Sequence, residues 1–334
     1  MSSAPHTPRP TGRRWLGTAL RIGGTAAAFA WIGWTTDLRE VVPAMGRVSA
    51  AAFVAAMAVT LLNLGVGAVR WRALLAAYGA PHRPPLGRLF HVYVVGFFYN
   101  NYLPGGVGGD VVRGVVTRES FGEGGVTASM TVVLVERVLG LAGLLLLVAG
   151  TSAVRPLPVA TAPGVAPLAL PSVGVLSALG LALALGAVAA VALGARLADR
   201  LPGALGGLGR RLPVLRRPGP FLFAVALSLL THTLVAVTGW LMLRVFAPTV
   251  ALADALVVVP LAMAMTYIPL GIGGLGWREK AFEVLCATFL GMARPDAVAA
   301  SLLVWITQMA VAGRGGLLQL VVPAGRPAPE RPAP

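Results

Sequence analysis

The chain contains few charged residues, and acidic residues are especially scarce. Charged side chains make up only 12% of its 334 residues, and Asp and Glu together number 12. A soluble globular domain carries roughly 25% charged residues, so this composition excludes that class. Hydrophobic residues make up 57% of the chain, and several runs approach the roughly 20 apolar residues that cross a bilayer. We therefore expect an all-α polytopic membrane protein.

Cysteine and the common catalytic motifs are also scarce or absent. Cys286 is the only cysteine, which excludes an intramolecular disulfide and a CxxC metal or redox site. The sequence contains no HExxH, GxSxG or Walker A motif and no clustered metal ligands. We therefore expect no cofactor, no metal site and no nucleotide hydrolysis, and we expect the protein not to be an enzyme.

Positive charge is abundant by contrast. The formal net charge is +15, carried by 26 arginines and one lysine, Lys280. A basic chain can bind nucleic acid, but these arginines are spread over the short segments that separate apolar runs. The positive-inside rule of membrane proteins explains such a distribution. We therefore expect the charge to report membrane topology, with no nucleic-acid partner.

Apolar segments alternate with arginine-containing loops along the chain. These segments span about 16–36, 50–69, 88–103, 125–149, 171–194, 219–243, 252–268, 275–290 and 296–322. Loops and tails assigned to one side hold 16 arginines, including Arg70, and the alternate loops hold five. This bias predicts that both termini are cytoplasmic in a cell-membrane protein. The tails 1–15 and 323–334 are rich in Pro and Arg, which predicts disorder.

A short phrase occurs twice in the sequence. Residues 103–109 read Leu-Pro-Gly-Gly-Val-Gly-Gly and residues 268–274 read Ile-Pro-Leu-Gly-Ile-Gly-Gly. An arginine lies nine positions after each proline, Arg113 in the first copy and Arg278 in the second. Pro and Gly break helices, and here they break them within apolar segments. This pattern is typical of duplicated transporters whose binding site lies at the breaks.

The arginine distribution requires two helical hairpins that do not cross the membrane. Segment 88–118 must begin and end on the cytoplasmic side, and segment 252–290 on the outer side. The chain then divides into a first membrane repeat, 16–150, and a second, 171–322, with about six full spans in total. Three spans per repeat is an odd number, so the second repeat is predicted to be inverted relative to the first.

The two hairpin tips carry the predicted binding site. A helix is expected to restart near Asp110, whose carboxylate would cap it. Free backbone N–H groups at a helix start, together with an arginine, are typical of a phosphate site. The alternative is that the glycines only permit close helix packing. The predicted head-group-binding residues are Asn100, Asn101, Pro104, Gly105, Gly106, Gly108, Gly109, Asp110, Arg113, Glu136, Arg137, Pro269, Gly271, Gly273, Gly274, Arg278 and Glu279.

Ionisable residues inside apolar segments need partners. Glu136 and Arg137 are adjacent on a helix and point about 100° apart, so each is expected to pair with another helix. Arg113 or Arg278 is a plausible partner of Glu136, and Arg278 or an arginine of the other half is a plausible partner of Glu279. A purely structural ion pair is the alternative. Three arginines at span ends, Arg70, Arg72 and Arg244, are expected to reach the interface. Two polar residues, His232 and Gln308, are expected to form interhelical hydrogen bonds.

The first phrase resembles a known family signature. Residues 100–113, read with the stretch 136–140 and the stretch 269–279, resemble the three characteristic blocks of the lysylphosphatidylglycerol synthase transmembrane family, also called the flippase-like domain family. The resemblance covers about residues 15–322 and implies movement of a lipid with a polar head group between leaflets. Bifunctional members carry an aminoacyltransferase domain after the membrane part, and this chain ends at residue 334. We therefore expect a stand-alone member that does not aminoacylate lipid.

The leading hypothesis is a lipid translocase that moves a phosphate-bearing head group between leaflets. Phospholipids and polyprenyl-phosphate carriers both fit, and the sequence indicates neither the lipid nor the oligomeric state. One alternative is a membrane enzyme acting on a lipid phosphate, with Asp110 or Glu136 as general base. Another is a non-transporting membrane partner of a lipid or cell-wall enzyme.

Overall fold

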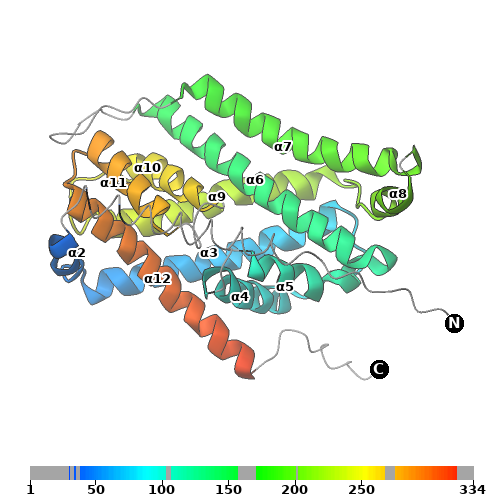
Figure 1. The fold of residues 1–334 in the computed structure, drawn as a ribbon, viewed down its shortest axis with the longest axis horizontal. Coiled ribbons are helices and arrows are strands. Elements are labelled where there is room, and N and C mark those ends of the chain that lie inside the picture. Colours follow the sequence, from blue (N-terminus) through cyan, green and yellow to red (C-terminus); the bar gives the residue numbers. More distant parts are fainter. Residues whose placement is uncertain are drawn as a thin grey trace.

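The structure, a computed structural model, describes residues 30, 34, 38–102, 107–156, 171–200, 202–267 and 275–321. Every regular element in those ranges is a helix (Figure 1). The α-helices are α2 (Leu38–Met45), α3 (Ala50–Ala77), α4 (Leu86–Tyr102), α5 (Gly108–Val116), α6 (Gly125–Val154), α7 (Val173–Arg196), α8 (Gly203–Arg210), α9 (Pro218–Leu243), α10 (Leu252–Ala264), α11 (Trp277–Phe289) and α12 (Arg294–Val321). The 3₁₀ helices are η1 (Arg118–Gly124), η2 (Ala198–Arg200) and η3 (Met265–Tyr267).

Five of these helices, α3, α6, α7, α9 and α12, are long and apolar enough to cross a membrane. The protein is therefore an all-α polytopic membrane protein, as predicted. The predicted span 16–36 falls almost wholly outside the described residues. The tails 1–15 and 323–334 fall entirely outside them.

Helix α3 extends further than the hydropathy pattern predicted. Its predicted end was residue 69, but the helix continues to Ala77. The added turns contain Arg, Trp, Leu and Ala and no Gly or Pro, so nothing in them interrupts the helix. Tyr78 is the C-cap, and Gly79 follows with φ of 75°, a left-handed conformation that glycine adopts readily. Arg70 and Arg72 are consequently helical residues.

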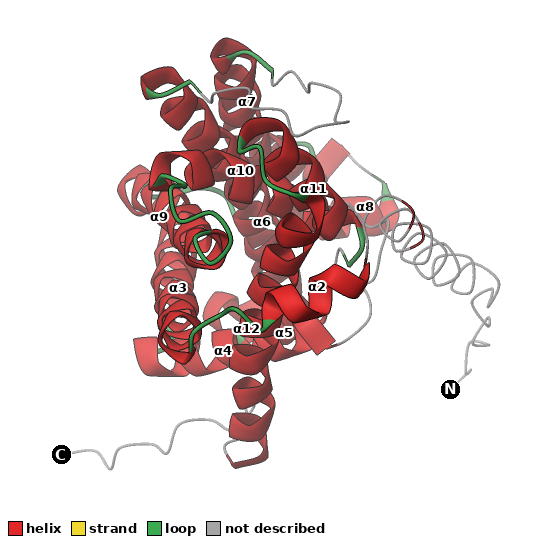
Figure 2. Cartoon of the chain, turned by 90° about the vertical axis from the view of Figure 1, so that its left-hand side faces the viewer, coloured by secondary structure: helices red, strands yellow, loops and turns green. Residues whose placement is uncertain are grey.

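Helices α3 and α9 lie side by side through the bundle (Figures 1 and 2). Helix α4 packs on α12, and α10 packs on α6. Helix α5 packs on α4 and α6, just as α11 packs on α10 and α12. Each contact in one half has a counterpart in the other: α4–α5 matches α10–α11, α5–α6 matches α11–α12, and α4–α12 matches α10–α6. A duplicated fold is expected to show such matching contacts. Helix α7 lies at the edge and packs mainly on α6 (Figure 1).

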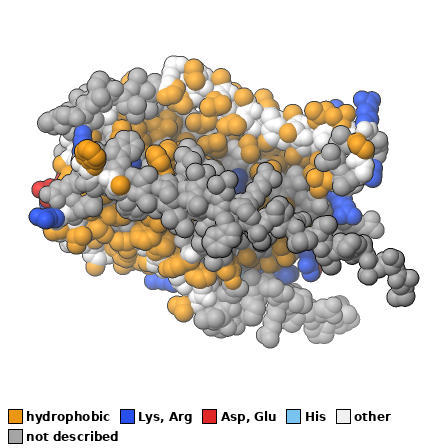
Figure 3. All heavy atoms as spheres, viewed as in Figure 1, with side chains coloured by type: hydrophobic (Ala, Val, Ile, Leu, Met, Phe, Trp, Pro, Cys, Tyr) orange, Lys and Arg blue, Asp and Glu red, His pale blue; other side chains and the backbone are white. Residues whose placement is uncertain are grey.

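One end of the bundle gathers the segments that flank α4 and α5. The Arg216 N–H donates to the carbonyl of Ala77 at 2.9 Å, and the His82 N–H donates to the carbonyl of Ser120 at 3.5 Å. The segments before α4, after α5 and before α9 therefore meet at this end, which we call the first end. Most loop arginines lie here, and Figure 3 shows Lys and Arg side chains concentrated at the right-hand side.

The opposite end, which we call the second end, gathers the segments that flank α10 and α11. Arg155, which follows α6, lies 3.5 Å from Asp254 in the first turn of α10. Arg47, which precedes α3, lies 3.3 Å from Asp296 in the first turn of α12. The α4–α5 pair thus begins and ends at the first end, and the α10–α11 pair at the second. The inverted repeat and the cytoplasmic side of the first end stay predictions.

Candidate functional site

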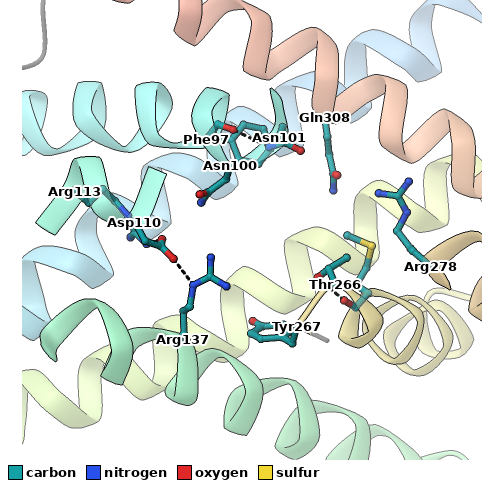
Figure 4. A pocket seen from close by; sticks show the side chains of 11 residues that line it. Phe97, Asn100, Asn101, Asp110, Arg113, Arg137, Thr266, Tyr267, Arg278 and Gln308 are labelled. Carbon is teal, nitrogen blue, oxygen red and sulfur yellow. Dashed lines mark hydrogen bonds and ion pairs between the residues drawn. The ribbon is translucent and has the colours of Figure 1, made fainter. Parts of the chain in front are cut away.

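A polar cavity of about 300 Å³ lies where the inner ends of the two broken helix pairs meet (Figure 4). Its walls come from α4, α5, α6, the α10–η3 segment, α11 and α12. The lining residues are Phe97, Asn100, Asn101, Asp110, Arg113, Arg137, Met263, Thr266, Tyr267, Arg278 and Gln308. Elements from both halves of the chain therefore contribute to one cavity.

The structure brings six of the predicted site residues to this cavity. They are Asn100, Asn101, Asp110, Arg113, Arg137 and Arg278. Four others lie outside the lining: Gly108, Gly109, Glu136 and Glu279. The remaining predicted residues lie outside the described residues, namely Pro104, Gly105, Gly106, Pro269, Gly271, Gly273 and Gly274.

Asp110 joins two arginines at one wall of the cavity. Its Oδ1 accepts from Arg113 at 2.5 Å, and its Oδ2 accepts from Nε of Arg137 (Figure 4). Asp110 and Arg113 are buried, whereas a third of the Arg137 side chain is exposed, so Arg137 is the more accessible of the two arginines. The carboxylate therefore fixes two cations beside the cavity.

Glu136 lies behind this wall and is 1% exposed. Its Oε2 accepts from Arg113 at 2.6 Å, and its Oε1 accepts from Arg70 at 2.9 Å and from the Tyr93 hydroxyl at 2.8 Å. Glu136 and Arg137 bind partners on other helices and do not bind each other, so the prediction that they would not pair is confirmed. The Glu136–Arg113 ion pair, one of the two considered, is also present.

The expectation that Arg70 reaches the membrane interface was wrong. Its side chain is 11% exposed and extends between helices, where it binds Glu136. Its Nη1 also lies 3.3 Å from both Ser228 and Thr231 of α9. The reason is that α3 continues past residue 69, so Arg70 lies within the bundle, where the Glu136 carboxylate compensates its charge.

The connected charges do not cancel. The ion pairs among the described residues join three arginines, Arg70, Arg113 and Arg137, to two carboxylates, Asp110 and Glu136, with a formal charge of +1. We call these five residues the ion network. The Arg113 guanidinium also lies over two aromatic rings, 5.0 Å from Trp71 and 4.6 Å from Tyr93. An excess positive charge in a membrane interior is costly unless an anion or water compensates it. The cavity is therefore suited to an anionic group.

Arg278 contributes a further guanidinium from the second half of the chain. It is 2% exposed and pairs with the neighbouring Glu279. The other oxygen of Glu279 accepts from the Gly276 N–H at 2.6 Å, which fixes the start of α11. Figure 4 shows the Arg278 guanidinium near Gln308, across the cavity from Asp110. Glu279 compensates Arg278, so this pair adds a donor without adding net charge.

The helix cap of α5 differs from the prediction. Asp110, the predicted cap, makes no cap hydrogen bond. Instead Oδ1 of Asn100 accepts from the Gly109 N–H at 2.7 Å. The cap comes from α4 because α4 and α5 approach closely at Gly96 and Gly109. A Cβ on Gly109 would lie only 1.9 Å from the Gly96 carbonyl oxygen. For Gly109 the close-packing explanation therefore holds.

Removing this cap should destabilise the α4–α5 pair modestly. We expect Asn100→Ala to lower the free energy of unfolding by about 0.5–2 kcal/mol, the usual cost of losing a helix cap. Asn101→Ala is the matched control. Among the described residues, the Asn101 amide donates to Phe97 of its own helix at 2.8 Å and to no other helix. Unfolding in mixed SDS and detergent micelles measures both. Equal effects would contradict the capping role of Asn100.

The interhelical hydrogen bonds predicted for His232 and Gln308 are present for one residue and not for the other. His232 forms the expected interhelical hydrogen bond, with Nε2 2.8 Å from the Gly140 carbonyl oxygen. Gln308 instead lines the cavity and forms no hydrogen bond to another described residue. Thr266 and Tyr267 also line the cavity, but the sequence reasoning did not select them. Their position directly before the second repeated phrase was the available signal.

A comparison with protein families matches most of the chain. The family described as "Lysylphosphatidylglycerol synthase TM region" matches residues 16–313. The chain belongs to this family. The matched range includes every residue that lines the cavity. A comparison with curated proteins found no match.

Proposed function

We propose that this protein is a lipid translocase that binds the phosphate of a lipid head group in the central cavity and moves it between leaflets. The observation that carries the proposal is the formal charge of +1 on the ion network beside a polar cavity inside a membrane bundle. A phosphodiester carries one negative charge, so its binding would neutralise the network.

The donors around the cavity match a phosphate. Guanidinium groups bind phosphate oxygens through charge-assisted hydrogen bonds. Arg137 and Arg113 contribute them from the first half and Arg278 from the second. Asn101 and Gln308 line the same cavity and offer amide groups to the polar part of a head group. A cavity of about 300 Å³ lies at the lower limit of typical ligand sites, so it fits a head group rather than a whole lipid.

The two broken helix pairs suggest how access could alternate. They begin and end at opposite ends of the bundle, and both reach the cavity. Rocking of one half against the other would open the cavity to one leaflet at a time while the acyl chains stay in lipid. We place the protein in the cytoplasmic membrane, with both termini and the arginine-rich first end in the cytoplasm. The lipid leaves chemically unchanged.

Arg137→Gln provides the sharpest test of this proposal. The substitution reduces the network to two arginines and two carboxylates, with no charge left over, and Asp110 keeps its bond to Arg113. We expect head-group translocation to fall about 10-fold to 100-fold, the equivalent of one or two charge-assisted hydrogen bonds. Dithionite quenching of labelled phosphatidylglycerol in proteoliposomes measures the rate, and mass spectrometry of the recovered lipid checks that it is unaltered.

The matched control is Arg118→Gln, which removes an exposed arginine at the first end. It should translocate lipid at the wild-type rate. Wild-type protein that moves labelled lipid no faster than protein-free vesicles would contradict the proposed function. Equal rates for wild type and Arg137→Gln would contradict the role of the cavity. A chemically changed lipid would indicate the enzyme alternative.

A further inference from the structure

A second, smaller cavity of about 150 Å³ lies beside the first, and Tyr267 lines both. Helices α3, α4 and α9 form its other walls. The lining residues are Asn63, Leu64, Gly67, Arg70, Tyr93, Thr231, His232, Val235 and Tyr267. Most of these side chains are polar. The head-group assignment uses none of Asn63, Thr231 or His232.

His232 presents an unused ring nitrogen within this part of the bundle. The residue is 9% exposed and lines the cavity. Its Nε2 is 2.8 Å from the Gly140 carbonyl oxygen, and because a carbonyl only accepts, Nε2 must carry the hydrogen. In the neutral ring Nδ1 is then an acceptor, and no described residue donates to it. Nδ1 is thus available to bind a proton or a water.

Asn63 provides a second acceptor of the same kind. Its Oδ1 is buried, and none of the described residues donates to it. Buried acceptors without protein donors are usually satisfied by internal water, which needs a polar cavity with room for it. A volume of about 150 Å³ holds a few water molecules, since one takes about 30 Å³ in the liquid. Hydroxyl groups of Tyr93, Thr231 and Tyr267 complete a lining suited to water.

We propose that this cavity is hydrated and that His232 takes up a proton on Nδ1 when an anionic head group occupies the neighbouring cavity. The inference rests on the proposed function and adds its energy coupling. The proton adds to the Nδ1 lone pair while Nε2 keeps its own hydrogen and its bond to Gly140, so an imidazolium forms and no other bond breaks. Release from the same atom reverses the step.

The charges around His232 explain why the two events would be linked. Arg70 on α3 opposes a second positive charge, whereas Glu136 on α6 favours it. Without a head group the network already carries +1, and a charged His232 would raise this to +2. A phosphodiester beside Arg137 removes that penalty. Coupling is reciprocal, so the proton also strengthens head-group binding. Proton and lipid would then move together.

Among the described residues, Arg70 and His232 are the basic side chains that line the small cavity, and no carboxylate lines it. Tyr93 on α4 and Tyr267 on η3 face the cavity as hydroxyl groups. On α10, Asp254 lies at the second end, where it pairs with Arg155. On α12, Arg294 and Asp296 lie in the first turn at the same end, and Arg314 is exposed. His232 is thus the described group best placed to gain a proton in the small cavity.

Calorimetry of lipid binding to the detergent-solubilised full chain tests this inference. Binding of dioctanoyl-phosphatidylglycerol is measured in buffers of different ionisation enthalpy between about pH 5 and pH 8, the range in which histidine titrates. We expect wild-type protein to take up between about 0.5 and 1 proton per lipid at the pH of maximal uptake. Inorganic phosphate, tested in parallel, shows whether the phosphate alone is sufficient.

Three variants sharpen the test. In His232→Gln the amide can still donate to Gly140 but cannot take up a proton, so lipid should bind without proton uptake. Asn63→Leu removes the second acceptor without touching the His232–Gly140 bond, and should reduce uptake by drying the cavity. His82→Gln removes an exposed loop histidine and should behave as wild type.

The outcomes separate the two proposals. Lipid binding without proton uptake by wild type at every pH would overturn the role of His232 and leave the head-group site intact. Equal proton uptake by wild type and His232→Gln would do the same. No lipid binding at all would contradict the head-group site, and with it the coupling.

Discussion

Glu136→Gln should yield little stably folded protein. Glu136 is buried and compensates Arg70 and Arg113, which are themselves buried or nearly so. Its neutral replacement leaves these guanidinium groups with only Asp110 as a connected carboxylate. Breaking a buried ion pair by removing one partner costs about 3–5 kcal/mol, a large share of the stability of a typical domain. Unfolding in mixed SDS and detergent micelles and size-exclusion profiles measure the loss.

Two variants at acidic positions control this prediction. Glu119→Gln removes an exposed carboxylate from η1 and should have the stability of wild type. Glu136→Asp keeps the negative charge on a shorter side chain, so its stability should lie between those of wild type and Glu136→Gln. A Glu136→Gln protein as stable as Glu119→Gln would show that the ion network does not hold the helices together.

Gly109→Ala should disrupt the α4–α5 pair and abolish most translocation. A Cβ at this position would lie 1.9 Å from the carbonyl oxygen of Gly96 and 2.7 Å from its Cα, which are backbone atoms that cannot turn aside. The helices must separate, and Asp110 and Arg113 move with α5. Overpacking usually costs about 1–3 kcal/mol, and a misplacement of about 1 Å at a functional site can cost about 100-fold in rate. We expect a loss of that order in the dithionite assay.

Alanine substitutions at three glycines with different amounts of surrounding space test whether close packing is the cause of the loss. A Cβ on Gly96 would come within 3.2 Å of the Gly109 carbonyl oxygen, whereas a Cβ on Gly87 would meet nothing within 4 Å. Translocation should therefore fall most in Gly109→Ala, less in Gly96→Ala and not at all in Gly87→Ala. Similar rates in all three variants would contradict close packing as the role of Gly109.

The sequence was sufficient to predict the helical membrane class and most apolar segments. Membrane spans depend on local composition, so a run such as 219–243 predicts α9 (Pro218–Leu243) almost to the residue. The ends of helices that contain charged residues were harder to predict. Arg70 looked like a loop residue because its partner, Glu136, lies 66 positions away, and only the packed bundle brings them together.

The sequence predicted which segments form the site, but not which of its side chains bind one another. The repeated phrase pointed to both walls of the cavity, because each Pro/Gly break is followed by polar residues such as Asp110 and Arg278. The sequence could not show that Asn100 caps α5 while Asp110 binds arginines. That choice depends on how closely α4 approaches α5, a distance set by Gly96 and Gly109. The small cavity around His232 likewise depends on the packing of α3 and α4 against α9 and Tyr267, which lie in the other half of the chain.

Native mass spectrometry of the gently purified protein tests the central claim most directly, because it detects a retained lipid. The claim is that the ion network beside the cavity binds one phosphate-bearing head group. Wild type and Arg118→Gln should each retain one phosphate-containing lipid per chain, and Arg137→Gln, whose network has no excess charge, should lose it. Retention of the same lipid at the same occupancy by Arg137→Gln would contradict the account.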